Sequence, residues 1–337
     1  MLSWQSHQFM TMAIQQYDRT RPLIDRAVNV PNVFAMHAPP RTSVEGLLRG
    51  AYDIAEMPMA RYVFLKEQGE PYTAIPVLPD RLFLQQYVFT RPDTGITSLT
   101  DLRGRKVLVP QYYLTSSLWH KGWLQEAGVS PTEVDWYTTS PERDPRISIP
   151  EGVKVTLAAG PHLGMEPLLD ETVDCIMTEG HPVVPAGQEH RVVRVHADVR
   201  GLQRQFFKDH RTLVSVHIIA MKSEAVAQRP ELLEQLCEAF DQAKAYAYRD
   251  LQNERLTSLP LMREYLDDTM ETFGSDPWPY GVDANRQEFE QLLTYAHDQG
   301  LTSRRLTIDD LFEKPARDFH FKSRMVSGSP PWVVPPP

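Results

Sequence analysis

Short apolar runs alternate with helix-like stretches along the first two-thirds of the chain. The runs at residues 33–37 and 106–109 are typical, since each holds four or five residues between polar or turn-forming segments. Between them, the stretch 42–49 has helical periodicity and stops before Gly50, a residue type that commonly ends helices. Because strands that alternate with helices are typical of parallel sheets covered by helices, the pattern predicts an α/β fold.

In the last third of the chain the pattern changes to helices alone. Within the stretch 231–251, Leu232, Leu236 and Phe240 recur at four-residue spacing, which is typical of a helix with one buried face. The stretch 283–299 has a similar pattern. We therefore predict a C-terminal helical segment that follows the α/β part.

Two stretches, 85–91 and 211–216, run from one α/β block into another, and a self-contained block lies between them. Two crossings between two blocks predict a bilobal clamshell of two α/β lobes. Its ligand is expected in the cleft, beyond the carboxyl ends of the parallel strands. The predicted parts are lobe 1 (residues 1–90 and 213–326), lobe 2 (91–212) and a Pro-rich tail (327–337).

Composition and charge exclude several classes of protein. The 337 residues carry 35 Lys and Arg against 44 Asp and Glu, a net charge of −9, so there is no basic surface for a nucleic-acid partner. The 17 glycines form neither a G-x-G-x-x-G nor a P-loop motif. The two cysteines, Cys175 and Cys237, are too few for a disulfide framework or a Cys-rich zinc site.

The chain start shows no targeting signal. Its first ten residues contain neither Lys nor Arg and no long apolar run, and no later stretch approaches the length of a membrane helix. We therefore expect a cytoplasmic protein without a membrane partner, unless a leader preceded this sequence. The sequence leaves open whether copies of the chain associate.

The loop that follows the first predicted strand contains Asp18, Arg19 and Arg21. Loops at the carboxyl ends of strands hold ligands in α/β proteins, and guanidinium groups bind carboxylates in a bidentate manner. The two arginines are therefore candidate carboxylate ligands. The alternative is a solvated turn in which Asp18 pairs with one of them.

Glu56 and His217 are candidates for acid–base chemistry. Glu56 ends a strand just before a helix, where it could equally cap that helix. His217 lies inside the apolar run 213–221 and needs a partner there, either as a satisfied core residue or as an acid–base group in the cleft. Arg81 lies in another strand-end loop and is not specific on its own.

Two further segments carry candidate ligand contacts. Thr115 and Ser116 begin a helix after a strand, a position that accepts anions, with simple capping as the alternative. Tyr112 precedes them and is suited to stacking on an aromatic ligand. In the turn 278–286, Tyr280 is a candidate contact, although such turns more often fill a core.

In their order along the chain, these segments resemble the 4,5-dihydroxyphthalate decarboxylase family. The resemblance covers roughly residues 12–314. It rests on 17–22 (YDRTRP), 53–57 (DIAEM), 109–119 (VPQYYLTSSLW), 216–218 (VHI) and 278–286 (WPYGVDANR). It implies a fold like that of type II periplasmic binding proteins, and a carboxy-lyase that acts without oxidation on a hydroxylated, phthalate-like aromatic acid.

The resemblance also implies roles for the candidate residues. His217 would donate a proton to the ipso carbon, and Glu56 or Asp18 would act on the phenol. The substrate carboxylates would bind to Arg19, Arg21 and Arg81, and the ring to Tyr112, Thr115, Ser116 and Tyr280. No redox cofactor is expected.

Some positions depart from the family pattern and leave alternatives open. Residues 84–86 (LQQ) replace a basic–His–Ser stretch, Gln111 replaces Glu, and 147–203 match poorly. The exact substrate is therefore open. The alternatives are a solute-binding protein for a small organic anion, a different lyase on this fold, and a divalent-metal enzyme with ligands among His162, Asp174, Glu179 and His181.

Overall fold

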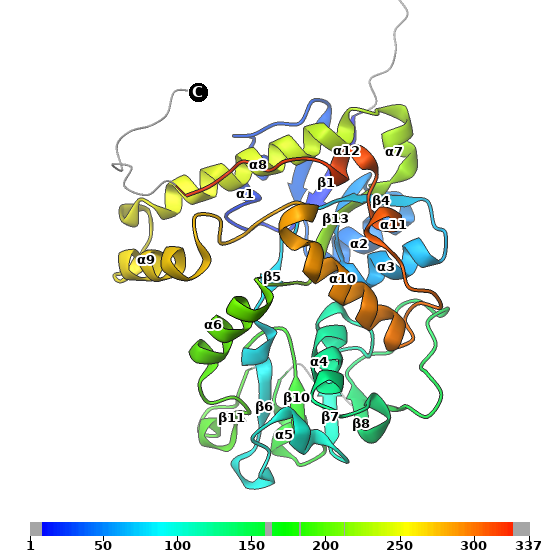
Figure 1. Cartoon of the computed structure of the whole chain (residues 1–337), viewed down its shortest axis with the longest axis vertical. Coiled ribbons are helices and arrows are strands. Elements are labelled where there is room, and N and C mark those ends of the chain that lie inside the picture. The colour runs from blue at the N-terminus through cyan, green and yellow to red at the C-terminus, as the bar shows by residue number, and fades with distance from the viewer. Residues whose placement is uncertain (1–8, 159–163, 182, 212, 326–337) are drawn as a thin grey trace, which may run out of the picture.

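The computed structural model describes residues 9–158, 164–181, 183–211 and 213–325, and these form two lobes stacked along the long axis of the molecule (Figure 1). Each lobe is built on its own sheet. Helices pack on both sheets, so the predicted α/β class and bilobal architecture are confirmed.

The sheet of the first lobe has the order β2-β1-β3-β13-β4. Its first three strands pair in parallel, whereas β13 enters from the second half of the chain and runs antiparallel to β3 and β4. The bounds are β1 Met10–Ile14, β2 Val33–His37, β3 Ile54–Pro58, β4 Tyr72–Ile75 and β13 His217–Lys222, with the helices α1 Arg21–Ile24, α2 Pro40–Arg49 and α3 Met59–Glu67. As predicted, α2 stops at Gly50, which has the left-handed φ of 78°.

The second lobe holds a six-stranded sheet with the order β11-β6-β10-β7-β8-β9. Strands β7 to β10 are parallel, and β6 runs antiparallel to β10. The bounds are β6 Val88–Thr90, β7 Lys106–Val109, β8 Asp135–Thr138, β9 Lys154–Leu157, β10 Cys175–Met177 and β11 Val193–Arg194, with α4 Thr115–Glu126, α5 Glu166–Leu169 and α6 Val199–His210.

The chain crosses between the lobes at a two-stranded ribbon. Strand β5 (Arg81–Leu82) pairs antiparallel with β12 (Val214–Ser215). Because β6 already pairs in the second sheet, the first change of lobe lies between β5 and β6, and the predicted boundary after residue 90 is wrong by one strand. The return crossing at β12 lies within the predicted stretch 211–216.

In the described residues that follow β13, the elements are all helices, as the pattern predicts. The bounds are α7 Ser223–Gln228, α8 Leu232–Leu251, α9 Met262–Phe273, α10 Val282–Asp298, α11 Ile308–Leu311 and α12 Lys314–Arg317. Short 3-10 helices are η1 Leu84–Tyr87, η2 Pro92–Thr94, η3 Leu99–Leu102, η4 Pro131–Glu133, η5 Glu189–Arg191 and η6 Glu254–Leu256.

These C-terminal helices pack against both lobes and not against the first lobe alone. The apolar stripe of α8 is buried in the first lobe, with Leu232, Leu236 and Phe240 fully inaccessible. Helix α10 instead contacts both α3 of the first lobe and α4 of the second, and so spans the junction (Figure 1).

Among the described residues, no helix combines the length and apolar character needed to cross a membrane. The cytoplasmic location and the association of copies stay predictions. The Pro-rich tail lies outside the described residues.

Candidate active site

The centre of the candidate site is a contact between His217 and Glu56 on neighbouring strands. Strand β13 begins with His217 and runs antiparallel to β3, with Ile219 opposite Glu56. This register brings His217 Nδ1 to 2.7 Å from Glu56 Oε1. The Glu56 side chain is fully buried, while 10% of the His217 side chain stays exposed. The two acid–base candidates of the sequence are therefore a hydrogen-bonded pair.

Two more donors hold the Glu56 carboxylate. The Gln15 backbone N–H donates to Oε2 at 2.9 Å, and the Tyr17 hydroxyl donates to Oε1 at 2.9 Å. Both residues follow β1, whose parallel pairing with β3 places the two strand ends side by side. The alternative role of Glu56 as a helix cap is not seen, because α3 has no side-chain cap.

The contact favours a charged pair. Burial acts to raise the pKa of Glu56, but the hydrogen bond and charge of His217, with the bonds from Gln15 and Tyr17, outweigh it and lower that pKa. Burial acts to lower the pKa of His217, but the bond and charge of Glu56 outweigh it and raise that pKa. Each partner stabilises the charged form of the other, so both shifts favour an imidazolium paired with a carboxylate.

Two further carboxyl groups lie near this pair. Asp80, between β4 and β5, has its Oδ2 atom 3.5 Å from His217 Nδ1. Glu179 follows β10 in the second lobe and accepts a hydrogen bond from Ser116 Oγ at 2.9 Å. Burial raises the pKa of Asp80 and of Glu179, and the charge of His217 opposes this rise only in part. Both groups can therefore exchange a proton closer to neutral pH than an ordinary carboxyl group.

The chain is similar along almost its whole length to a known enzyme. It is 30% identical over 325 residues to the 4,5-dihydroxyphthalate decarboxylase of Comamonas testosteroni, which covers 93% of this chain and 98% of that protein. The chain belongs to the 4,5-dihydroxyphthalate decarboxylase family. The enzyme of the same name from Pseudomonas putida is 30% identical over 193 residues, covering 52% of this chain and 75% of the relative. The predicted family and its enzyme class, carboxy-lyase, are confirmed.

Other comparisons agree on the fold. Residues 8–144 match the model of the ABC transporter phosphonate periplasmic substrate-binding protein. The aliphatic sulphonate binding protein SsuA from Escherichia coli aligns over 91% of this chain and 92% of its own, with a TM-score of 0.54 and 13% identity. Protein AF1704 from Archaeoglobus fulgidus aligns over 88% and 99%, with a TM-score of 0.52 and 15% identity. This decarboxylase family member therefore has the predicted periplasmic-binding-protein-like fold.

Arg19 lies beside the site and is already occupied. Its Nε donates to the carbonyl of Pro79 at 2.8 Å, and its guanidinium lies 3.8 Å from the ring centroid of Trp278. Asp18 pairs with Arg19 at 2.9 Å, and about half of the Asp18 side chain is exposed. The solvated-turn alternative therefore describes Asp18, and the structure does not bring its carboxylate into the His217 cluster.

The predicted convergence of three arginines is not found. Arg21 lies in α1, pairs with Asp25 four residues on, and exposes 64% of its side chain. Arg81 has a fully buried side chain and lies 3.1 Å from Glu288 of α10. It also donates to the Leu213 carbonyl at 2.7 Å. Strand β5 is too short to reveal from sequence that its arginine points into the protein, where its charge is already paired.

The two tyrosine candidates are core residues rather than ring platforms. Tyr112 is buried, and its ring centroid lies 5.9 Å from that of Trp136. Lys121 Nζ lies over the Tyr112 ring, 3.2 Å from its centroid. Tyr280 is buried against Phe321.

The two hydroxyl candidates at the start of α4 lie where the lobes meet. Thr115 Oγ1 accepts from the Ala60 backbone N–H of the first lobe at 3.1 Å, and Ser116 holds Glu179. Neither side chain caps α4, so simple capping is not their role.

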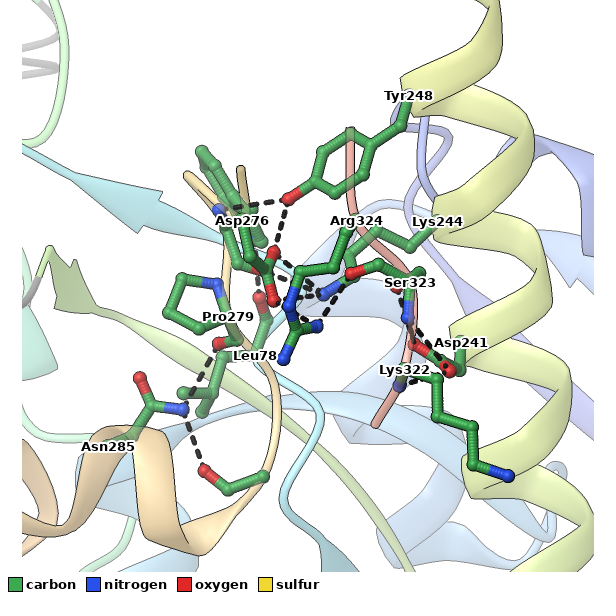
Figure 2. A network of polar contacts seen from close by, with 12 residues as sticks. Leu78, Asp241, Lys244, Tyr248, Asp276, Pro279, Asn285, Lys322, Ser323 and Arg324 are labelled. Carbon is green, nitrogen blue, oxygen red and sulfur yellow. Dashed lines mark hydrogen bonds and ion pairs between the residues drawn. The ribbon is translucent and has the colours of Figure 1, made fainter. Parts of the chain in front are cut away.

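The turn 278–286 owes its distinctive sequence to structure (Figure 2). Asp276, just before it, accepts from Lys244 at 3.0 Å and from Tyr248 at 2.6 Å. Asn285 Nδ2 closes the turn by donating to the carbonyls of Pro279 and Gly281. Lys244 and Tyr248 also form hydrogen bonds with the backbone of Trp278, whose ring lies beneath Arg19, so the segment supports Arg19 beside the site.

The metal ligands considered from sequence do not gather. Asp174 precedes β10 and accepts from the Lys106 N–H, whereas Glu179 follows the same strand. His181 packs on Tyr87, and His162 lies outside the described residues. Within the described chain, metal-like spacing occurs at Glu56, Asp80 and His217, whose ligand atoms lie within 4.8 Å of one another.

Sequence reasoning missed Asp80 as a site residue, and it considered Glu179 as a cleft or metal-binding residue but not as an acid–base group. Asp80 stands beside Arg81 at a strand end, which was the available signal. Glu179 lies in the segment that matched the family poorly, and its partner Ser116 is more than sixty residues away along the chain.

Proposed function

We propose that this protein decarboxylates a hydroxylated, phthalate-like aromatic acid without oxidation, in the cleft between its lobes. One observation carries the proposal: a charged His217–Glu56 pair lies within reach of the carboxyl groups of Asp80 and Glu179. A proton donor and proton-exchanging acceptors are what this reaction needs.

The chemistry proceeds in balanced steps. A base takes the proton of a ring hydroxyl para or ortho to the carboxylate, and the electron pair of that O–H bond moves into the ring. The ipso carbon then takes a proton and loses its aromatic bonding. The bond to the carboxylate breaks, its electron pair restores the aromatic ring with a phenolate oxygen, and CO₂ leaves. The protonated base then returns its proton to that oxygen, and the proton donor is recharged by one proton from solvent. The net change replaces a carboxylate with a hydrogen atom.

His217 is the proton donor in this scheme. Its Nδ1 is engaged by Glu56, so Nε2, which makes no hydrogen bond within the described residues, is the nitrogen that delivers the proton to the ipso carbon. Glu56 touches no substrate and keeps the imidazole charged and oriented. This is the arrangement expected of an acid whose charged form must persist at neutral pH.

Glu179 is the base for the ring hydroxyl. It lies on the opposite lobe from His217, whereas Asp80 lies beside His217 on the same lobe. The reacting carbon and a para hydroxyl stand on opposite sides of an aromatic ring, so an acid and a base on opposite lobes match them. Ser116 orients Glu179 through its hydrogen bond.

We place no resident metal in this scheme. The two oxygens of Glu56 already accept from Gln15, Tyr17 and His217, and a cation at Glu56 would displace these donors. The donor set therefore fits a proton-transfer pair better than a metal centre.

Incubation of the protein with a panel of hydroxylated benzene dicarboxylates, followed by detection of CO₂ and product, tests the function. We expect turnover of at least one member. His217→Gln keeps an N–H donor for Glu56 but cannot donate to carbon, so kcat should fall by about 100-fold or more. His320→Gln, at an exposed histidine, is the matched control and should leave kcat unchanged.

A near-normal kcat in His217→Gln would remove His217 from this role. Tight binding of one acid without any product would favour the alternative of a solute-binding protein.

A further inference from the structure

A cavity of about 350 Å³ lies where the two lobes meet. Its wall on the first lobe comes from α2 and from the junction of β3 and α3, including Pro58 and Ala60. Its wall on the second lobe comes from the segment after β7 and from the loop 142–147. Apolar surface is supplied by Val44, Leu48, Leu114, Ile147 and Leu301. The cavity therefore offers room and apolar contacts for a small ring.

This cavity borders on the candidate active site. Pro58, part of its wall, is the cross-strand partner of His217. Ala60 donates its backbone N–H to Thr115 Oγ1 across the lobe junction, one residue before Ser116. The cavity thus lies next to the strand pair that carries His217, and Leu114 at the start of α4 forms another part of its wall.

One of the cations that line the cavity lacks a partner. Arg41 pairs with Glu45 at 3.2 Å, and Arg61 pairs with Asp144 at 2.8 Å. Arg143 is exposed and makes neither a hydrogen bond nor an ion pair with any residue that the structure describes. Burial of part of the side chain and repulsion by Arg41 and Arg61 lower the pKa of Arg143. The carboxylates of Glu45 and Glu179 act in the opposite direction without forming an ion pair with Arg143, so the guanidinium is open to a ligand's carboxylate.

The loop that carries this cation is held on both sides. Asp144 accepts from Arg146 Nε at 3.0 Å and Nη2 at 2.8 Å, and Arg146 pairs with Glu70 of the first lobe at 2.7 Å. On the other side of Arg143, the Glu142 carboxylate accepts from a backbone N–H at 3.0 Å. Arg143 is thus a free side chain on a fixed backbone, which is suited to binding a ligand that enters the cavity.

We propose that Arg143 binds the carboxylate that an aromatic dicarboxylic acid keeps during the reaction, an inference that rests on the function proposed above. A guanidinium binds a carboxylate through two parallel N–H···O bonds. In an ortho-dicarboxylic acid the retained carboxylate stands on the carbon next to the reacting one. Its counter-charge must then lie close to the proton donor, and the cavity meets this condition because its wall includes Pro58, the cross-strand neighbour of His217.

Equilibrium binding of phthalate to the full chain, measured by calorimetry, tests the assignment. Phthalate has both carboxylates but no hydroxyl group for the proposed reaction, so binding is separated from turnover. Arg143→Met should weaken phthalate binding roughly 10- to 100-fold and benzoate binding much less. Arg143→Lys keeps the charge without the fork and should fall between. Arg263→Met, on the surface of α9, removes the same charge elsewhere and should have no effect.

Equal phthalate affinity in the wild type and Arg143→Met would overturn the assignment. Equal weakening of benzoate and phthalate would overturn it too, as would failure of the wild type to bind phthalate at millimolar concentration. If Arg143-dependent binding is found but no hydroxylated acid is decarboxylated, the proposed function fails and the carboxylate site stands. If turnover is found with a KM that Arg143→Met leaves unchanged, the site fails and the function stands.

Discussion

At the scale of single residues, the carboxyl groups of the site differ in how strongly their surroundings favour the charged form. Glu56 is buried more completely than Asp80, yet its pKa is lowered while that of Asp80 is raised. The difference comes from hydrogen-bond donors, because three of them donate to the Glu56 carboxylate. One carboxylate is thereby fixed as an anion beside His217, and the others are left to exchange protons.

Glu56→Gln should shift the pH dependence of the reaction. The raised pKa keeps His217 charged above its ordinary 6.5, and this acid form is lost as the pH rises through the raised value. Without the carboxylate, burial lowers the pKa, so the alkaline limb of the kcat profile should move to lower pH by about one unit or more. A pH–rate profile with an NMR titration of His217 measures this. Glu231→Gln, at a surface position, is the control, and an unmoved limb would contradict the proposed pairing.

The same pair sets a stability window whose sign follows from the two shifts. The lowered pKa of Glu56 adds stability that is lost as the pH falls through that lowered value. The raised pKa of His217 adds stability that is lost as the pH rises through the raised value. The pair therefore stabilises the fold most between these two limits.

How far the sequence predicts the site depends on distance along the chain. Glu56 and His217 were found because each stands out locally, one at a strand end and one in an apolar run. Arg81 was misread because its role depends on Glu288, some two hundred residues away. Glu179 was missed as an acid–base group for the same kind of reason, since its setting depends on the packing of two lobes.

At the scale of elements, the crossing ribbon and α10 form one buried polar unit. Arg81 of β5 and Glu288 of α10 pair at 3.1 Å with almost no exposure of either side chain. Glu288 also accepts from the Ser215 N–H of β12. Three elements from distant parts of the sequence are thereby held at the point where the chain passes between lobes.

Glu288→Gln should destabilise the protein by about 3 kcal/mol, because a buried guanidinium would lose its counter-charge. The expected observation is a lower midpoint of urea unfolding. Glu290→Gln, on the exposed side of the same helix, removes an equal charge and should leave the midpoint within about 0.5 kcal/mol of the wild type. Matching midpoints for both variants would show that the pair adds nothing to stability.

The element pattern was largely predictable, and its failures are local. Strand–helix alternation and the α8 stripe follow from periodicity, which a sequence displays directly. The three residues of β6 gave no sign of which sheet they join, because pairing with β10 is a long-range contact. The lobe boundary was therefore misplaced by that strand.

At the scale of the whole molecule, contacts between the lobes determine whether the site is assembled. Glu179 and His217, the base and the acid of the proposed mechanism, come from different lobes, so packing of the lobes against each other brings them together. Arg61 of the first lobe and Arg146 of the second share Asp144, whose side chain is 5% exposed. The two crossings were visible in the sequence and predicted the clamshell, whereas these closing contacts depend on side chains that no pattern marks.

Asp144→Asn should loosen this closure without touching the acid–base pair. The two arginines hold the pKa of Asp144 far below its usual range, so the Asp144 carboxylate is charged at every pH at which the enzyme would be assayed. With a neutral amide, the loop that carries Arg143 loses its ion pair with Arg61 and, within the described chain, keeps only the Arg146–Glu70 pair as an ion pair with the first lobe. Phthalate binding should then weaken roughly 3- to 10-fold, a loss smaller than that of Arg143→Met. X-ray scattering should show a larger radius of gyration for the ligand-free variant.

The alkaline limb set by His217 should stay where it is, because Glu56 and His217 are both on the first lobe. Asp267→Asn, which breaks a surface pair within α9, is the matched control. Unchanged scattering and affinity in Asp144→Asn would show that the lobes close without the Asp144–Arg61 pair. A shifted alkaline limb would show that closure of the lobes also changes the pKa of His217.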